Sequence, residues 1–181
     1  TLGINIPRPL AALIDGVILT LGTIYVVFFS PTFIGPFQSF LITLGVPLAA
    51  WAGIMIADIA LRKRDYDDAA LFDAGGRYGA WDWVSIGTMV VASVIGWGLV
   101  VNNFAADAAW NNWQGYLLEP LGLGTYVDDP AGPYWDGAWP YANLGVLLAL
   151  VLAFLVTYVA RRAKVRDQEM DRGFASYGPD R

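Results

Sequence analysis

Residues 40–73, FLITLGVPLAAWAGIMIADIALRKRDYDDAALFD, join an uninterrupted apolar run to a dense group of charges. The run is too apolar for the surface of a soluble protein. The basic triplet Arg62, Lys63 and Arg64 and the aspartates that follow it are too polar for the hydrocarbon core of a bilayer. A helix that crosses a membrane and ends at its polar surface accounts for both parts.

The composition of the chain agrees with a membrane environment. Of its 181 residues, 56% are hydrophobic and 15% are charged, whereas an average soluble domain has about 25% charged residues. The mean hydropathy is +0.48. A bilayer core needs a helix of about 20 apolar residues, and the chain contains four such runs. The sequence therefore predicts an all-α integral membrane protein with four transmembrane helices.

We expect the spans at residues 10–29, 37–61, 81–101 and 140–160 of a single membrane region, residues 1–181. The runs do not alternate apolar with polar residues as the strands of a membrane barrel do. The remaining segments are the loops 62–80 and 102–139 and a tail, 161–181.

The positions of the basic residues predict the orientation. All eleven Lys and Arg residues lie before the first span, between the second and third spans, or after the fourth. By the positive-inside rule, both termini and the 62–80 loop are cytoplasmic, in a multi-pass protein of the plasma or inner membrane. The basic residues 161, 162, 164 and 166 also offer a contact with anionic lipid.

The outer loop, 102–139, is rich in Trp and Tyr. Such rings are typical of chain lying along the headgroup region, and we expect one short helix near residues 110–118. A ligand-binding surface is the alternative interpretation of this loop.

Several classes of active site are excluded by residue content. The chain has no Cys and no His, which removes the usual zinc, haem and Cys–His sites, and it has no glycine-rich phosphate-binding loop. We expect no enzymatic activity, no metal site, no cofactor bound by this segment and no nucleic-acid partner. The bilayer itself is the expected partner.

Small residues recur every four positions in the second span, at Gly45, Ala49, Gly53 and Ala57. Close approach of helices across small side chains drives their association in lipid, so this face predicts a partner helix. The third span has a shorter version in Thr88, Ala92 and Gly96.

Pro47 lies inside the second span and removes one backbone hydrogen bond. The carbonyl that it frees needs another partner or must face a cavity. We expect a bend near Gly45 and Pro47, either as plain architecture or as part of a moving, ligand-facing element.

Two acidic residues lie near the ends of apolar runs. Asp15 follows Arg8 by seven residues on roughly the same helical face, and Asp58 precedes Arg62 by four. The second spacing suits an ion pair. We expect pairing or snorkelling at both acids, with proton or ion coupling as the alternative.

The segment FQSFLITLGVPLAAWAGIMIADIALRKRDYD, residues 37–67, resembles the tenth transmembrane helix and the following cytoplasmic loop of the nucleobase:cation symporter family, the purine/cytosine, allantoin and hydantoin permeases. The run GIMIADI, residues 53–59, and the basic residues after it carry the resemblance. The flanking segments resemble the ninth, eleventh and twelfth helices, so the similarity covers the whole chain.

The resemblance implies a twelve-helix, five-plus-five inverted-repeat transporter that takes up a heterocyclic base by alternating access, driven by a sodium or proton gradient. In such carriers the tenth helix is a thin outer gate. The resemblance assigns the substrate contact to Leu41, with Phe40 and Thr43 as weaker candidates, and the bend to Gly45 and Pro47. The helices that build the main substrate and ion sites have no counterpart here.

Because the resemblance is to the last four helices, we expect this chain to be a fragment, a truncated gene product or one piece of a split carrier. The remaining helices, in cis or in trans, and a nucleobase-type molecule are then its partners. The alternative is a stand-alone four-span scaffold or accessory subunit, with the small-residue faces and the aromatic loop as interaction surfaces.

Overall fold

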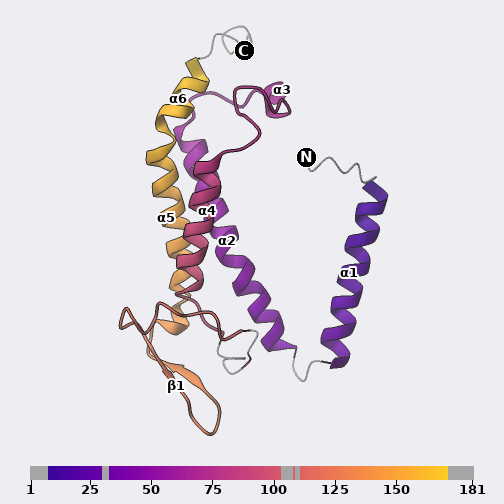
Figure 1. The fold of residues 1–181 in the computed structure, drawn as a ribbon, viewed down its shortest axis with the longest axis vertical. Coiled ribbons are helices and arrows are strands. Elements are labelled where there is room, and N and C mark those ends of the chain that lie inside the picture. The colour runs from indigo at the N-terminus through magenta and orange to yellow at the C-terminus, as the bar shows by residue number, and fades with distance from the viewer. Residues whose placement is uncertain (1–7, 30–32, 103–107, 109–110, 171–181) are drawn as a thin grey trace.

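In the computed structural model, three helices pack side by side and a fourth stands apart from them (Figure 1). The structure describes residues 8–29, 33–102, 108 and 111–170. The long helices are α1 (Arg8–Phe29), α2 (Ile34–Leu61), α4 (Trp83–Trp97) and α5 (Leu144–Ala160). The prediction of an all-α membrane protein is confirmed.

The helix lengths support fewer crossings than the four predicted. Among the described residues, two helices, Pro9–Phe29 and Ile34–Leu61, are long and apolar enough to cross a membrane. A third candidate is the pair formed by α5 and α6 (Arg162–Met170), which meet at an angle of 52°. The remaining apolar helix, α4, has 15 residues, or about 22 Å at 1.5 Å per residue.

Helix α4 is shorter than the predicted span because the loop after it replaces its last turns. The backbone N–H of Gly115 donates to the carbonyl of Trp97 at 3.0 Å, and that of Leu117 donates to Gly98 at 2.9 Å. A helix end leaves carbonyls without intrahelical partners, and the loop supplies the donors. The predicted span 81–101 therefore contains helix only over residues 83–97.

The bundle is formed by α2, α4 and α5, and its core is made of small and branched side chains: Val46, Ala50, Ile54, Ala92, Val100, Ala149 and Ala153. Glycines allow the backbones to touch. A Cβ placed on Gly53 would lie 2.3 Å from the Leu150 carbonyl oxygen, and one on Gly145 would lie 2.0 Å from that of Gly96. The helices are therefore closer together than any larger residue at these positions allows.

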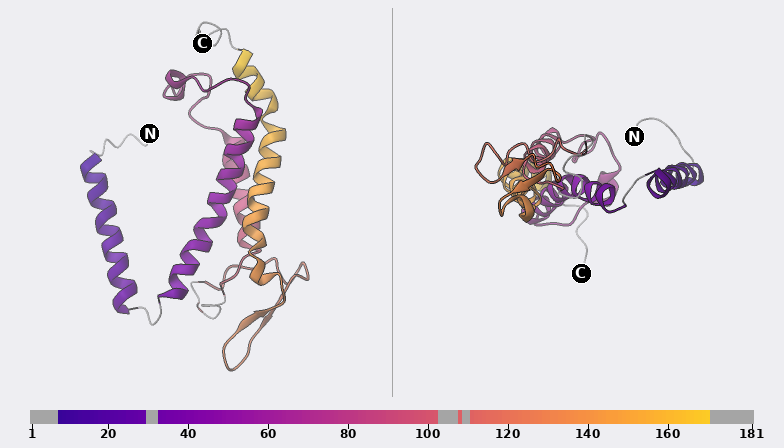
Figure 2. Two further views of the ribbon diagram at one scale, coloured as in Figure 1. Left: turned by 180° about the vertical axis from the view of Figure 1, so that it is seen from behind. Right: turned by 90° about the horizontal axis from the view of Figure 1, so that it is seen from below.

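Helix α1 makes no such contacts. None of its 18-residue apolar window is buried, and both views in Figure 2 show it separated from the bundle. The side chain of Asp15, in α1, is exposed. The side chain of Arg8 lies outside the described residues, and so does the predicted pairing of the two.

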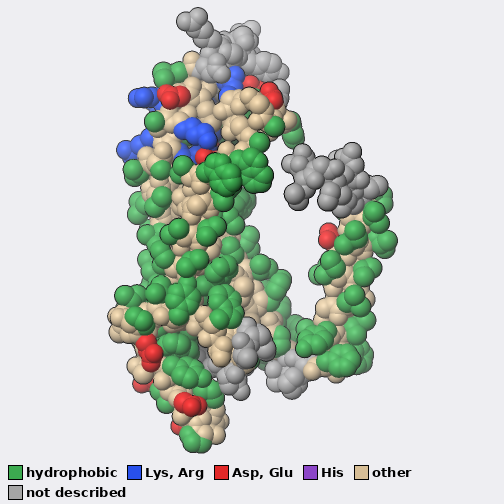
Figure 3. Space-filling model, viewed as in Figure 1, with side chains coloured by type: hydrophobic (Ala, Val, Ile, Leu, Met, Phe, Trp, Pro, Cys, Tyr) green, Lys and Arg blue, Asp and Glu red, His purple; other side chains and the backbone are tan. Residues whose placement is uncertain are grey.

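The two ends of the bundle differ in charge. We call the end formed by Leu61, Trp83 and Ala160 the basic end, and the end formed by Ile34, Trp97 and Leu144 the hairpin end. Lys and Arg side chains gather at the basic end, and hydrophobic side chains cover the helices between the two (Figure 3). Helix α1 begins on the same side as the basic end (Figure 1).

A β-hairpin projects from the hairpin end and was not predicted. Strands β1 (Thr125–Val127) and β2 (Tyr134–Asp136) pair antiparallel, with Tyr126 opposite Trp135. The helix expected near residues 110–118 is wrong for residues 111–118, which form turns; Trp110 lies outside the described residues. The signal for the hairpin was the sequence DDPAG, residues 128–132, between two aromatic segments.

The basic end also has more structure than expected. The loop 62–80 contains the short helix α3 (Asp68–Leu71), and residues 162–170 of the predicted cytoplasmic tail form α6. Val165 and Gln168 of α6 are buried. Residues 171–181 lie outside the described part.

Candidate functional site

The predicted gate residues occupy two different sides of α2. Phe40 and Leu41 have 60% and 51% of their surface exposed. Thr43 is partly buried and faces the bundle. Of the three predicted gate residues, Phe40 and Leu41 could therefore contact a molecule or another helix on the exposed side of α2, and Thr43 could not.

Helix α2 continues through Pro47 as one helix of 28 residues. A proline at this position cannot donate to the carbonyl four residues earlier, which belongs to Thr43. The indole N–H of Trp97 donates to this carbonyl at 3.0 Å. The expectation that the freed carbonyl finds another partner is confirmed; the bend itself stays a prediction.

Thr43 is held through its side chain as well. The amide nitrogen of Gln114, from the loop after α4, donates to the Thr43 hydroxyl oxygen at 2.9 Å. The carbonyl and hydroxyl oxygens of Thr43, one turn before Pro47, thus both accept hydrogen bonds, one from α4 and one from the loop after it.

The four small residues of α2 do not share one environment. Gly53 and Ala57 are buried in the bundle, and Gly53 lies against the α5 backbone. Gly45 and Ala49 are partly exposed, and Gly45 has open space around it. Val46 and Ala50 are buried instead of them.

A buried polar cluster lies near the hairpin end of α2. The Asn102 amide donates to the Gly35 carbonyl at 2.9 Å and to the Ser39 hydroxyl at 2.5 Å, and that hydroxyl donates to the Asn111 side-chain oxygen at 2.5 Å. The cluster holds the first turns of α2 through side chains.

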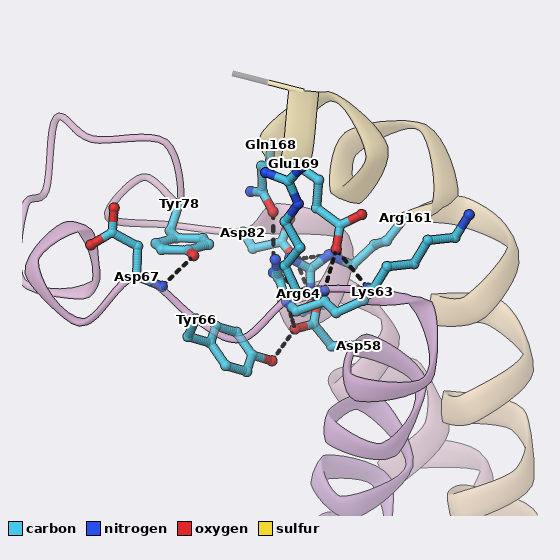
Figure 4. A network of polar contacts seen from close by, with 12 residues as sticks. Asp58, Lys63, Arg64, Tyr66, Asp67, Tyr78, Asp82, Arg161, Gln168 and Glu169 are labelled. Carbon is cyan, nitrogen blue, oxygen red and sulfur yellow. Dashed lines mark hydrogen bonds and ion pairs between the residues drawn. The ribbon is translucent and has the colours of Figure 1, made fainter. Parts of the chain in front are cut away.

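The basic end contains a network of ion pairs around Asp58 (Figure 4). Asp58 lies in the last turn of α2 and is 5% exposed. Its carboxylate accepts from Arg62 at 2.8 Å and pairs with Arg161, at the end of α5, at 2.7 Å. The predicted Asp58–Arg62 ion pair is confirmed. The partner from α5 was not predicted.

Asp82, directly before α4, extends this network. It pairs with Arg161 at 3.0 Å and with Lys164 of α6 at 3.0 Å. Arg161 therefore lies between two carboxylates and connects the ends of α2, α4 and α5. This arrangement leaves Arg161 and Lys164 engaged within the protein, whereas the sequence had suggested lipid for both.

The loop 62–80 closes over the network. Tyr66 donates its hydroxyl hydrogen to Asp58, and the Arg62 guanidinium lies 4.4 Å from the centre of the Tyr66 ring and 5.2 Å from that of Tyr78. Burial raises the pKa of the Tyr66 hydroxyl, and its bond to the Asp58 carboxylate raises it further, against the opposing effect of Arg62.

Helix α6 secures the same loop. Gln168 accepts from Arg62 at 3.1 Å and donates to the Arg77 carbonyl at 3.1 Å. Glu169 accepts from the backbone N–H groups of Lys63 and Arg64 at 2.6 and 3.1 Å. The network fixes the three helices to one another at this end.

The network joins the ends of α2, α4 and α5 through ion pairs. Within the described ranges, no three acidic side chains are grouped to hold a metal ion. Sequence reasoning found one pair of this network. The other pairs had one signal in the sequence. Asp82 and Arg161 both lie at the predicted cytoplasmic ends of their spans, so they could be expected at the same end of the bundle.

The segment with these features matches a known family. Residues 1–127, which include α1, α2, α4 and β1, match the family of permeases for cytosine/purines, uracil, thiamine and allantoin. The chain belongs to this permease family. No curated protein and no solved structure gave a match.

The permease family fixes the class of the protein. Its members are transporters of nucleobases and related compounds, which implies a transporter rather than an enzyme. In the described part of the chain, the two single helices that are long and apolar enough to cross a membrane, α1 and α2, lie within the matched residues. The chain is therefore a multi-pass membrane protein of a nucleobase permease family.

Proposed function

We propose that this chain carries the outer gate of a cation-coupled carrier for purines, cytosine or a related heterocyclic base, and that the carrier works by alternating access. The family match supports the transport of such a compound. The proposed gate is the half of α2 between the hairpin end and Pro47. In this proposal the basic end faces the cytoplasm of a plasma or inner membrane.

The observation that carries the gate proposal is the contrast between the two halves of α2. After Pro47, Gly53 contacts the α5 backbone and Asp58 is held by two arginines. Before Pro47, Gly45 has open space around it, and Phe40 and Leu41 are exposed. The hydrogen bonds that hold this half come from side chains of α4 and of the loop after it. Such bonds can exchange partners, so this half can move about the proline while the half packed on the α5 backbone stays in place.

The exposed faces of α1 and α2 support the further proposal that other helices of the carrier pack against them, in cis or in trans. The main substrate and ion sites would lie in those helices, and sodium or protons would drive uptake. The family match favours this role over a stand-alone scaffold or accessory subunit.

The gate proposal is tested by Leu41→Trp in the full-length carrier, with uptake of radiolabelled cytosine, adenine and allantoin measured in cells that lack their own permeases. We expect a several-fold loss of uptake, because a larger ring obstructs the closing of the gate over the substrate. Surface biotinylation normalises each rate to the amount of carrier.

Leu48→Trp is the matched control. Leu48 lies on α2 just after Pro47 and is 58% exposed, so it receives the same change in the fixed half and should retain uptake. Unchanged uptake and affinity in Leu41→Trp would refute the gate assignment.

A further inference from the structure

We propose that Trp97 is a positioning residue that holds the outer half of α2 at the Pro47 hinge. This inference rests on the gate proposed above. It concerns a residue of α4, outside the gate helix, and a bond between a side chain and the backbone.

The bond has a specific cause in the sequence. In an uninterrupted helix the carbonyl of residue 43 accepts from the backbone N–H of residue 47. Proline has no N–H, so this acceptor would be left unpaired in an apolar surrounding, which is unfavourable. Trp97 supplies the missing donor at 3.0 Å. An internal backbone bond is thereby replaced by a bond to another helix.

The indole is well placed for this role. Trp97 is the last residue of α4, its ring packs against the core cluster of the bundle, and it meets the Trp113 ring edge to face at 5.5 Å. Next to it, Gly96 leaves room for Val46, because a Cβ on Gly96 would lie 2.5 Å from a Val46 methyl group. The donor is therefore fixed in position beside the proline.

Other hydrogen bonds between described residues and the outer half of α2 are of the same kind. Gln114 binds Thr43, and Asn102 and Asn111 bind Gly35 and Ser39, all through side chains. Side-chain bonds can exchange partners during a motion, whereas the backbone contact at Gly53 cannot. Trp97 differs from these residues because its bond takes the place of the backbone bond that Pro47 removes, and so acts at the hinge itself.

Spin-label distances test the inference in the native polypeptide that contains these 181 residues. The chain has no Cys, so introduced pairs are unique once any cysteine elsewhere is replaced. The reporting pair is Phe37→Cys with Leu147→Cys, and the reference pair is Ile59→Cys with Val159→Cys; all four side chains are exposed. Phe37 lies about 15 Å from the hinge, so a tilt of about 10° moves it by about 2.5 Å.

We expect Trp97→Phe, which keeps the ring and removes the donor, to broaden or shift the 37–147 distance by about 2 Å or more and to leave the 59–159 distance unchanged. Adding Pro47→Ala restores the backbone donor for Thr43. The double variant should therefore return the 37–147 distance to that of Pro47→Ala alone. Trp51→Phe, the same change at a ring that is 53% exposed, is the control.

Three results would overturn the inference: no change in the 37–147 distance, equal changes in both pairs, or no rescue by Pro47→Ala. The last would mean that Trp97 acts by packing alone. The distances involve no substrate, so they separate the two proposals. If Trp97→Phe alters the 37–147 distance while Leu41→Trp has normal uptake, the role of Trp97 stands and the gate assignment fails. If the distance is unchanged while Leu41→Trp loses uptake, the gate assignment stands and the role of Trp97 fails.

Discussion

Arg161 shows how much one side chain can contribute when it lies between two carboxylates. Its side chain is 11% exposed and pairs with Asp58 and Asp82. Removing one partner from a buried ion pair leaves uncompensated charge, which costs far more than the intact pair contributes. Arg166, five residues later, pairs with Asp167 at 3.9 Å while it is 72% exposed, a geometry that contributes little.

Arg161→Gln should lower the free energy of unfolding by about 1–3 kcal/mol, because both carboxylates lose a buried partner but each keeps a second cation. Arg166→Gln should change it by about 0.5 kcal/mol or less. Both variants remove one positive charge, so the difference reports burial and pairing. Chemical denaturation in detergent micelles, followed by tryptophan fluorescence, measures both. Equal changes in the free energy of unfolding would argue against a stabilising role for the network.

Tyr66 makes the same network sensitive to alkaline pH. Because its pKa is raised in the folded protein, the proton is held more tightly there than in the unfolded chain, whose value is about 10. The resulting stability is complete below about pH 10 and is lost as the pH rises through the folded pKa.

We therefore expect Tyr66→Phe to be less stable than the original protein at pH 7, by about 1 kcal/mol, and the difference to shrink above about pH 10. Thermal unfolding of both proteins between pH 7 and pH 11 measures it. A difference that stays constant over this range would show that ionisation of Tyr66 does not contribute.

At the scale of elements, α2 and α5 can approach closely because Gly53 has no side chain. A Cβ on Gly53 would meet backbone atoms of α5 at 2.3 and 3.0 Å, and backbone atoms cannot rotate away. Small residues at such contacts supply the association of helices in lipid. Gly45, two turns earlier on the same helix, has open space around it.

Gly53→Ala should destabilise the bundle by about 1–3 kcal/mol, the usual cost of overpacking. Gly45→Ala should be neutral or stabilising, because alanine is favoured over glycine in a helix by about 1 kcal/mol. Thermal unfolding in detergent, with both variants measured side by side, decides between them. Equal losses of stability would mean that the close approach of α2 and α5 is not specific to Gly53.

At the scale of the whole molecule, the ends of the helices agree with the pattern of charge. Loop 62–80, helix α6 and the start of α1 lie on one side, and the β-hairpin lies on the other (Figures 1 and 2). If the bundle crosses the membrane as proposed, α4 must cross it too, in spite of its 15 residues.

Single cysteines test this topology, because the chain has none of its own. Asp128→Cys, at the hairpin, should react with a membrane-impermeant maleimide in intact cells. Asp65→Cys, in the loop after α2, should react only after permeabilisation. Labelling of both positions from the same side would exclude a crossing by α4.

The sequence by itself determined the membrane environment, the approximate positions of the helices and the difference in charge between the two ends of the bundle. A long apolar run leaves a chain few alternatives in a bilayer, and the cost of placing Arg or Lys in hydrocarbon is local. The Asp58–Arg62 pair was predictable for the same reason, since the two residues are four positions apart at the end of one helix. So was the need of the Thr43 carbonyl for a partner, which follows from a proline four residues later.

Only the tertiary structure decided which partners meet these needs. Trp97 lies 54 residues from Thr43, and Arg161 lies 103 residues from Asp58 and 79 residues from Asp82. No local spacing encodes those contacts. The contact face of α2 also changed, with Val46 and Ala50 buried in place of Gly45 and Ala49, because the approach of α4 and α5 selects the face. Local chemistry states which groups require a partner, and the packing of distant segments supplies it.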